Sequence, residues 1–244
     1  PLHGLVLRRG GAGAQLLKSH AESLMRVATN LRPEEAYGVG RATTNTVVQS
    51  VVAIVIADLV FTAGNYPAGN KTTLSGTSQW SDYTNSDPVA DINGALDTPL
   101  MRPNILVIGR AAWSKLASHP KIMKAVQGNS GDAGIARRQQ VAELFELEEI
   151  LVGDAWYNTA KEGQTATFSR VWGKHAALLY RNRAANTRAG ITFGLTAQYG
   201  TRIAGAEPDK NIGLRGGQRV RTGETVKEVL CASDVGYLYT NAVA

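Results

Sequence analysis

The side chains able to perform nucleophilic catalysis are few in this chain. The possible nucleophiles are Ser75, Ser78 and Cys231, and the possible bases are His119 and His175. A serine hydrolase of the nucleophile-elbow type carries its serine in a Gly-x-Ser-x-Gly turn, and the segment SGTS that holds both serines lacks this form. Each histidine lies beside residues typical of a helix start or a turn, which indicates surface or capping positions. We therefore predict no catalytic residues and a protein that is not an enzyme.

The single cysteine restricts redox and metal chemistry. Cys231 is the only thiol, so neither an intrachain disulfide nor a paired-cysteine metal motif can form. It falls in a segment of predicted strand, where a buried, inert thiol is expected. One unpaired thiol also fits a reducing compartment such as the bacterial cytoplasm.

Three aspartates in a short segment raise the question of a cation site. Asp87, Asp91 and Asp97 lack the alternating acidic positions and terminal glutamate of a calcium loop. Asp87 precedes a proline and suits the N-cap of a helix, and Asp91 falls in the second turn of that helix. His3 and His20 have no histidine four residues further on, so a helical zinc pair is excluded there. We predict no metal site.

A glycine-rich segment near the start partly resembles a phosphate-binding loop. Residues 9–15 (RGGAGAQ) follow an apolar triplet and precede a possible helix. The third glycine of the dinucleotide fingerprint is missing, and so is the Lys-Ser/Thr of a P-loop. A flexible arm is the better interpretation, and no cofactor is expected.

Length and composition are those of an ordinary globular protein. The chain has 244 residues, 43% hydrophobic and 19% charged, enough for one large domain or two interleaved smaller ones. Its net charge of +6 is spread over scattered basic pairs rather than a run. This pattern predicts a solvated basic surface that tolerates packed DNA nearby, not a dedicated nucleic-acid binder.

No membrane segment or signal peptide is expected. The apolar stretch at the start is too short for a signal peptide. The most apolar region, residues 47–63, is interrupted by Gln49, Ser50 and Asp58. A membrane span needs roughly 20 mostly apolar residues, so this region is expected inside the protein core.

The first half of the chain predicts a long helix followed by smaller elements. Residues 42–64 carry apolar side chains at helical spacing. Their β-branched content leaves two strands as an alternative, while the length favours one helix of roughly 35 Å at 1.5 Å per residue. Residues 1–40 predict an arm. Asp87-Pro88 predicts a helix start, and the apolar run at 105–108 predicts a buried strand.

The remaining elements mix helices and strands without a regular strand–helix–strand alternation, which indicates the α+β class. Helices are expected at 111–116, 119–126 and 135–147, around a loop at 127–134. Strands are expected at 71–74, 149–152, 170–172, 176–180, 219–221, 228–231 and 235–239, with a strand pair within 190–203.

The four tryptophans lie far apart, each within or beside an apolar element. Core packing is the first expectation for them and interface anchoring the second. They are Trp80, Trp113, Trp156 and Trp172.

Three blocks of short motifs follow one another along the chain. The first, Leu74 to Ile92, contains Trp-Ser-Asp and then Ser-Asp-Pro at the predicted helix start. The second holds Pro-Asn before the 105–108 strand, then Gly-Arg-Ala-Ala-Trp and Leu-Ala-Ser-His-Pro-Lys-Ile. The third comprises residues 212–224 and 236–243. In this order the blocks resemble the major capsid proteins of Mu-like and related tailed phages, and the resemblance covers roughly residues 45–244.

The resemblance implies the Hong Kong 97 fold. In that fold a spine helix and a peripheral domain of long strands support an axial domain, and an arm and an extended loop reach neighbouring subunits. The division implied for this chain is an arm or extended loop at 1–41, the spine helix at 42–65, the peripheral domain at 66–102 and 188–229, and the axial domain at 103–187 and 230–244.

The same resemblance implies a major head protein that self-assembles as hexamers and pentamers into an icosahedral shell around double-stranded phage DNA. Assembly is expected in the host bacterial cytoplasm, and the protein is expected in the virion. The implied partners are copies of itself, a portal, scaffold or decoration proteins, and non-specifically bound packaged DNA, with no membrane. The alternatives are an encapsulin-like nanocompartment shell protein of the same fold and a soluble hydrolase.

Overall fold

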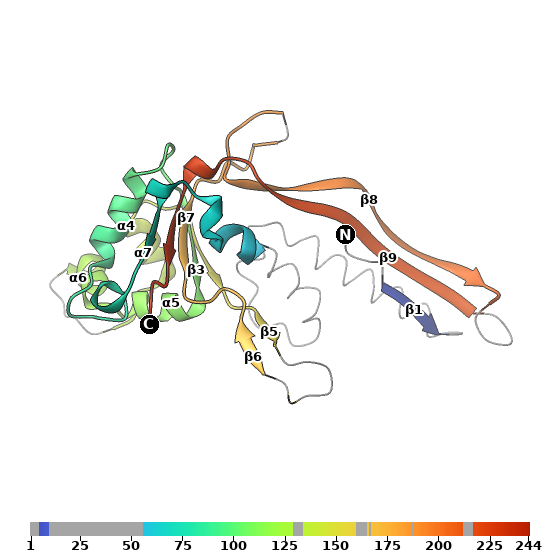
Figure 1. Cartoon of the computed structure of the whole chain (residues 1–244), viewed down its shortest axis with the longest axis horizontal. Coiled ribbons are helices and arrows are strands. Elements are labelled where there is room, and N and C mark those ends of the chain that lie inside the picture. Colours follow the sequence, from blue (N-terminus) through green and yellow to red (C-terminus); the bar gives the residue numbers. More distant parts are fainter. Residues whose placement is uncertain are drawn as a thin grey trace.

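A compact unit of helices and strands carries a long ribbon of strands that extends away from it (Figure 1). The computed structural model describes residues 5–9, 56–128, 134–159, 165, 167–186, 188–211 and 217–244. Mixed helices and strands confirm the predicted α+β class. Within the described ranges, no helix is long and apolar enough to cross a membrane.

The centre of the compact unit is a five-stranded sheet. Its order is β2-β10-β7-β3-β4, with β3 parallel to β4, β10 parallel to β2, and β7 antiparallel to both β3 and β10. The strands are β2 (Lys71–Thr73), β3 (Ile105–Gly109), β4 (Glu149–Gly153), β7 (Ala176–Leu179) and β10 (Gly236–Thr240). Every residue of β3 and β7 is buried. Their continuous apolar runs follow from a sheet that is covered on both faces.

Four helices cover one face of this sheet. They are α4 (Pro88–Asp97), α5 (Arg110–Ala117), α6 (Pro120–Gln127) and α7 (Arg138–Leu144). Leu106 and Ile108 of β3 point into the core beneath them, together with the buried Ile92 of α4 and Leu116 of α5. The predicted start of α4 is confirmed, because the Asp87 side chain accepts a hydrogen bond from the Ala90 N–H at 3.2 Å and a proline occupies the first turn.

The other face of the sheet packs against residues 56–66 and several later side chains. Ile105 and Val107 of β3 join Ile56, Val60 and Trp172 in a second buried cluster. Residues 56–61 are helical, so the predicted spine helix ends at Phe61 and a 3-10 turn follows at Ala63–Asn65; residues 42–55 of that prediction lie outside the described residues. Short 3-10 turns connect the elements at Ala63–Asn65, Ala68–Asn70, Gly76–Ser78 and Ser233–Val235.

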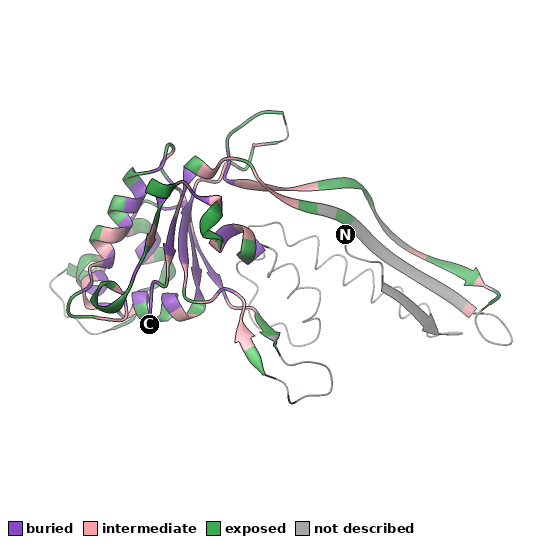
Figure 2. Ribbon diagram, in the orientation of Figure 1, coloured by how far each residue is buried: buried purple, intermediate pink, exposed green. Residues whose placement is uncertain are grey.

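The ribbon is a pair of long antiparallel strands, β8 (Gly194–Asp209) and β9 (Gly217–Leu230). A third strand, β1 (Leu5–Arg9), pairs with the far half of β9. The pairing of β8 with β9 is interrupted between Tyr199 and Ile203 by an irregularity that includes Gly200 at φ 71. Figure 2 shows that burial is concentrated in the compact unit, whereas the described ribbon residues are exposed or intermediate.

The ribbon corrects one sequence prediction. A strand pair within 190–203 is wrong, because this segment enters a single strand whose partner is β9. The strand predicted at 219–221 and residues 228–230 of the strand predicted at 228–231 are instead parts of β9. The alternating pattern fitted either arrangement, since a hairpin and a long strand differ only in where the chain turns.

Smaller corrections concern segments 135–172. The predicted helix at 135–147 begins only at Arg138 and ends at Leu144. The predicted strand at 170–172 is wrong beyond Arg170, because residues 171–174 form a turn that places Trp172 in the core. A two-stranded sheet of β5 (Trp156–Asn158) and β6 (Phe168–Arg170) lies here instead, and β5 was not predicted.

The compact unit draws on segments far apart in sequence. Leu74, Trp80 and Ile92 share one buried cluster with Leu106 and Ile150. Residues 71–97 therefore pack with 105–152, while the long strands of the ribbon come from 194–230.

Candidate assembly surfaces

The structure places the two candidate bases in different surroundings, and both hydrogen-bond away from the candidate nucleophiles. His119 is fully buried, which corrects its prediction as a surface residue but confirms its capping role. Its Nδ1 accepts from the Lys121 N–H at 3.2 Å, and its Nε2 lies 3.1 Å from the Ser86 Oγ. His175 is half-buried, and its Nδ1 accepts from the Asn241 N–H at 3.2 Å.

The hydrogen bonds of His119 define one protonation state. The Ser86 hydroxyl donates to the Asp82 carbonyl at 2.6 Å, so its oxygen is free to accept from His119 Nε2–H. A neutral ring with its proton on Nε2 allows both hydrogen bonds of His119, because Nε2–H donates to the Ser86 hydroxyl and Nδ1 accepts from the Lys121 N–H. Burial, followed by the nearby Lys121 ammonium, lowers the pKa of His119 below its usual range. This arrangement fixes the start of α6.

The three candidate nucleophiles lie on loops and turns. Ser75 and Ser78 bond each other across a 3-10 turn, with the Ser78 hydroxyl donating to the Ser75 carbonyl at 2.8 Å. Cys231 is exposed just after β9, which corrects the expectation of a buried thiol in a strand. β9 ends at Leu230, one residue before Cys231.

The three aspartates of the predicted helix each meet a different donor. Asp87 accepts from Lys121 Nζ at 3.1 Å, and Asp97 accepts from an arginine beyond the helix. Asp91 accepts from Trp80 Nε1 at 2.9 Å, and burial raises its pKa. Across the described ranges, no three His, Cys, Asp or Glu side chains gather where they could hold a metal ion.

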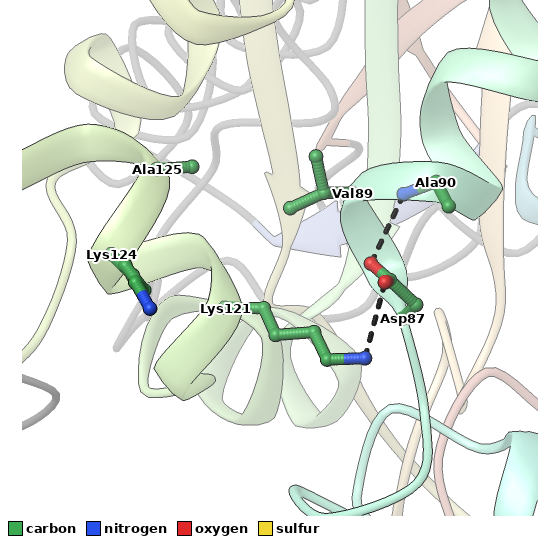
Figure 3. A pocket seen from close by; sticks show the side chains of 6 residues that line it. All are labelled: Asp87, Val89, Ala90, Lys121, Lys124 and Ala125. Atoms are coloured by element: carbon green, nitrogen blue, oxygen red, sulfur yellow. Dashed lines mark hydrogen bonds and ion pairs between the residues drawn. The ribbon is translucent and has the colours of Figure 1, made fainter. Parts of the chain in front are cut away.

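A shallow groove of about 410 Å³ lies between the first turn of α4 and α6 (Figure 3). Val89, Ala90 and Ala125 form its apolar wall, and two lysines of α6 line the remainder. One of them, Lys121, is held by Asp87, as the dashed line in Figure 3 shows. The groove is open; Asp87 caps α4, and its ion pair with Lys121 joins α4 to α6.

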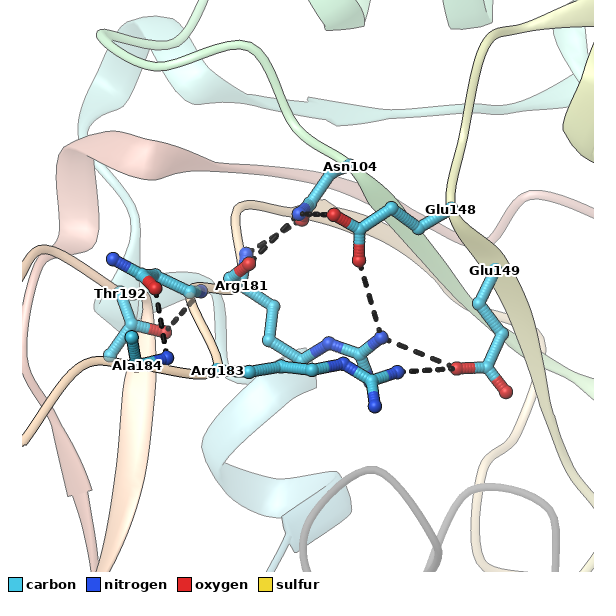
Figure 4. Close-up of polar contacts among 8 residues, drawn as sticks. Asn104, Glu148, Glu149, Arg181, Arg183, Ala184 and Thr192 are labelled. Carbon is cyan, nitrogen blue, oxygen red and sulfur yellow. Dashed lines mark hydrogen bonds and ion pairs between the residues drawn. The ribbon is translucent and has the colours of Figure 1, made fainter.

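A polar network that sequence reasoning missed lies at the end of the sheet where β3 and β4 begin (Figure 4). Asn104 accepts from the Arg181 N–H at 2.7 Å and donates to the Arg181 carbonyl and to Glu148, each at 2.8 Å. The largely buried Arg181 guanidinium lies 3.3 Å from Glu149 and 3.6 Å from Glu148. Asn104 and Arg181 are 77 positions apart, so the sequence alone does not show that they meet.

The β5–β6 hairpin presents aromatic side chains away from the core. Phe168 is 63% exposed and Trp156 is 42% exposed. Burial of Trp80, Trp113 and Trp172 confirms core packing for three tryptophans, whereas Trp156 corrects that expectation. The Arg170 guanidinium lies 4.2 Å from the centre of the Trp156 ring and 2.8 Å from a carboxylate oxygen of Asp154.

The ribbon offers the second exposed surface. Tyr199, in the middle of β8, is 85% exposed, and none of the described ribbon side chains beyond Phe193 is buried. An antiparallel sheet normally packs one face on a core. A ribbon whose described side chains are buried on neither face is typical of an element that contacts other chains.

Comparisons with known proteins agree on one family. The family model described as "Phage major capsid protein E" matches residues 65–209. A major capsid protein of Pseudomonas phage JBD67 is 53% identical over 186 residues, covering 76% of this chain and 60% of that protein. A major capsid protein of Burkholderia phage BcepMu is 30% identical over 189 residues, covering 75% and 59%. The chain thus spans about three-fifths of the length of these relatives.

A solved structure is similar over most of the chain. The crystal structure of a phage-related protein from Bordetella bronchiseptica RB50 matches with a TM-score of 0.66 and 25% identity. The match covers 85% of this chain and 70% of that one, so it includes more than the compact unit.

Proposed function

The chain belongs to the phage major capsid protein E family, and on that basis we propose that it is the major capsid protein of a tailed phage. The family consists of structural head proteins rather than enzymes, and its place is the virion. The observation that carries the proposal is the family match, which covers residues 65–209 and so ends with β8. The ordered blocks of sequence similarity agree with it.

Assembly is the proposed activity. Copies of the chain associate as hexamers and pentamers, and these close into an icosahedral shell around double-stranded DNA. The ribbon and the hairpin support this proposal, because none of the described ribbon side chains beyond Phe193 is buried and both Phe168 and Trp156 of the hairpin are exposed. Contacts between unlike surfaces can close into rings, which is the arrangement that hexamers and pentamers need.

The proposed division follows the Hong Kong 97 fold, with the spine helix at 42–65, a peripheral domain that includes the ribbon at 188–229, and the axial domain at 103–187 and 230–244. The assignment of 66–102 to the peripheral domain stays a prediction. The shared core of Trp80 and Ile92 with β3 favours placing residues 71–97 in the axial domain. The arm at 1–41 also stays a prediction; its described part, β1, pairs with β9. Portal, scaffold and decoration proteins remain proposed partners.

The packaged DNA is proposed to be bound without sequence preference. The net charge of +6 is spread over the chain, so contact with phosphates would be weak and sensitive to salt. A nanocompartment shell would instead enclose protein cargo.

Electron microscopy of the purified native assembly tests the proposal, with absorbance measured for nucleic acid. Closed polyhedral particles that contain DNA are the expected result. Closed particles filled with protein and free of DNA would favour the nanocompartment alternative. Small discrete oligomers at every salt concentration and pH would contradict a shell protein altogether.

A further inference from the structure

We propose that the aromatic face of the β5–β6 hairpin is a contact surface for a second copy of this chain within the shell. The inference rests on the proposed function and names one of its surfaces. The hairpin leaves the compact unit beside the sheet and stands clear of the ribbon (Figure 1).

Strand register defines the two faces of the hairpin. Trp156 pairs with Arg170, and Asn158 pairs with Phe168. Residues directly opposite each other, and residues two apart on one strand, point to the same face of a sheet. Trp156, Arg170 and Phe168 therefore share one face, while Tyr157 and its partner Ser169 lie on the other.

The shared face has the composition of an interaction hot spot. Trp, Tyr and Arg are the residue types that most often dominate protein interfaces. Phe168 is 63% exposed and Trp156 is 42% exposed, although both rings would gain from burial. A two-stranded hairpin is at best marginally stable by itself, so packing by a neighbour would also stabilise the hairpin.

Charge favours a protein partner over DNA. Among the described residues of this face, Arg170 is the cation, and its guanidinium is paired with Asp154 at 2.8 Å while it covers the Trp156 ring. The pair carries no net charge, whereas binding to phosphates depends on unpaired Lys and Arg. The face is therefore suited to an apolar protein surface.

Area favours contact within a shell over an isolated dimer. Aromatic side chains bury about 150–250 Å² each, so the exposed parts of Trp156 and Phe168 amount to roughly 200 Å². A stable interface buries about 800 Å² on each partner. The hairpin supplies about a quarter of this area, which suits one of several simultaneous contacts between neighbouring copies.

The first test compares assembly of the full chain with its variants. Phe168→Ser removes the most exposed ring of the face, and Phe168→Tyr retains it. Ser169→Ala, on the opposite face, is the matched control. We expect Phe168→Ser to raise the protein concentration needed for shell formation at least tenfold, with the two controls within twofold of the unchanged chain. Circular dichroism of the unassembled variants verifies that they fold.

The second test measures burial of the face directly. Trp156 is the one tryptophan of the four that is not buried, so iodide quenching of tryptophan fluorescence reports mainly on this residue. Quenching is expected in the unassembled chain and should be largely lost in shells. Equal quenching in both states would overturn the proposal, and so would protection in the unassembled chain, because the chain would then cover the face itself.

The experiments distinguish failure of the proposed shell function from failure of the proposed hairpin contact. If the unchanged chain never forms particles, the proposed function fails and the contact fails with it. If the unchanged chain and Phe168→Ser form particles at the same concentration, the hairpin contact alone is refuted.

Discussion

Replacement of Gly153 by alanine should destabilise the chain through a single packing conflict. Gly153 ends β4 and is directly opposite Gly109 of β3. A methyl group at position 153 would overlap three atoms of the Trp172 ring. Trp172 is fully buried, and Phe61 packs edge-on against it with ring centres 5.8 Å apart, so the indole has little room to move.

Two opposing effects determine the magnitude. Where the backbone conformation allows alanine, a Gly→Ala change stabilises a protein by about 0.4–1 kcal/mol, because the unfolded chain loses freedom. Forcing an extra methyl group into a packed core costs about 1–3 kcal/mol. The overlap involves a buried ring rather than the end of a flexible side chain, so the packing cost should dominate. We expect Gly153→Ala to lower the free energy of unfolding by about 1–2 kcal/mol.

The same change should reverse its sign when the ring is removed. In a Trp172→Leu background, the methyl group enters space that the indole has left. Gly153→Ala should then be neutral or stabilising by up to about 1 kcal/mol. Urea unfolding of the four unassembled chains, followed by circular dichroism, gives the double-mutant cycle. An equal cost of Gly153→Ala in both backgrounds would refute the packing explanation.

Two further predictions concern buried polar groups. Burial lowers the pKa of His119 in the folded chain below its unfolded value of 6.5, so its contribution to stability should be complete above pH 6.5 and should be lost as the pH drops from there through the folded pKa. The variant His119→Asn retains a capping acceptor, and its free energy of unfolding in urea should change less between pH 7.5 and 5.5. An equal change in both proteins would exclude His119 as the cause. Asn104→Ala removes three hydrogen bonds to Arg181 and Glu148 and should lower the free energy of unfolding by about 2–4 kcal/mol. Thermal unfolding checks this value, and a loss below about 0.5 kcal/mol would show that water replaces the amide.

The elements predicted correctly are those whose signals are local. Asp87 before a proline specified the start of α4, and the apolar run at 105–108 specified a buried strand. Both signals act within a few residues, through backbone capping and through the need to cover a strand on two faces. The family resemblance, too, was visible in the order of short blocks.

The elements missed depend on partners far away in sequence. The alternating residues 190–203 favoured a strand but contained no information about its partner, which is β9. The burial of His119 follows from Ser86, 33 positions earlier, which accepts its ring proton. A polar side chain can be buried only where such partners exist, and sequence spacing does not reveal them.

The sequence by itself determined the α+β class, the starts of α4 and α6, the central strands and the capsid family. Tertiary structure alone decided that β8 and β9 form one ribbon, that Arg181 joins Asn104 and Glu149, and that Trp156 faces outward while the other tryptophans are buried. The physical reason is the range of the forces involved. Capping and periodic burial are set by neighbours along the chain, whereas strand pairing, ion pairing and exposure are set by segments that meet only after folding.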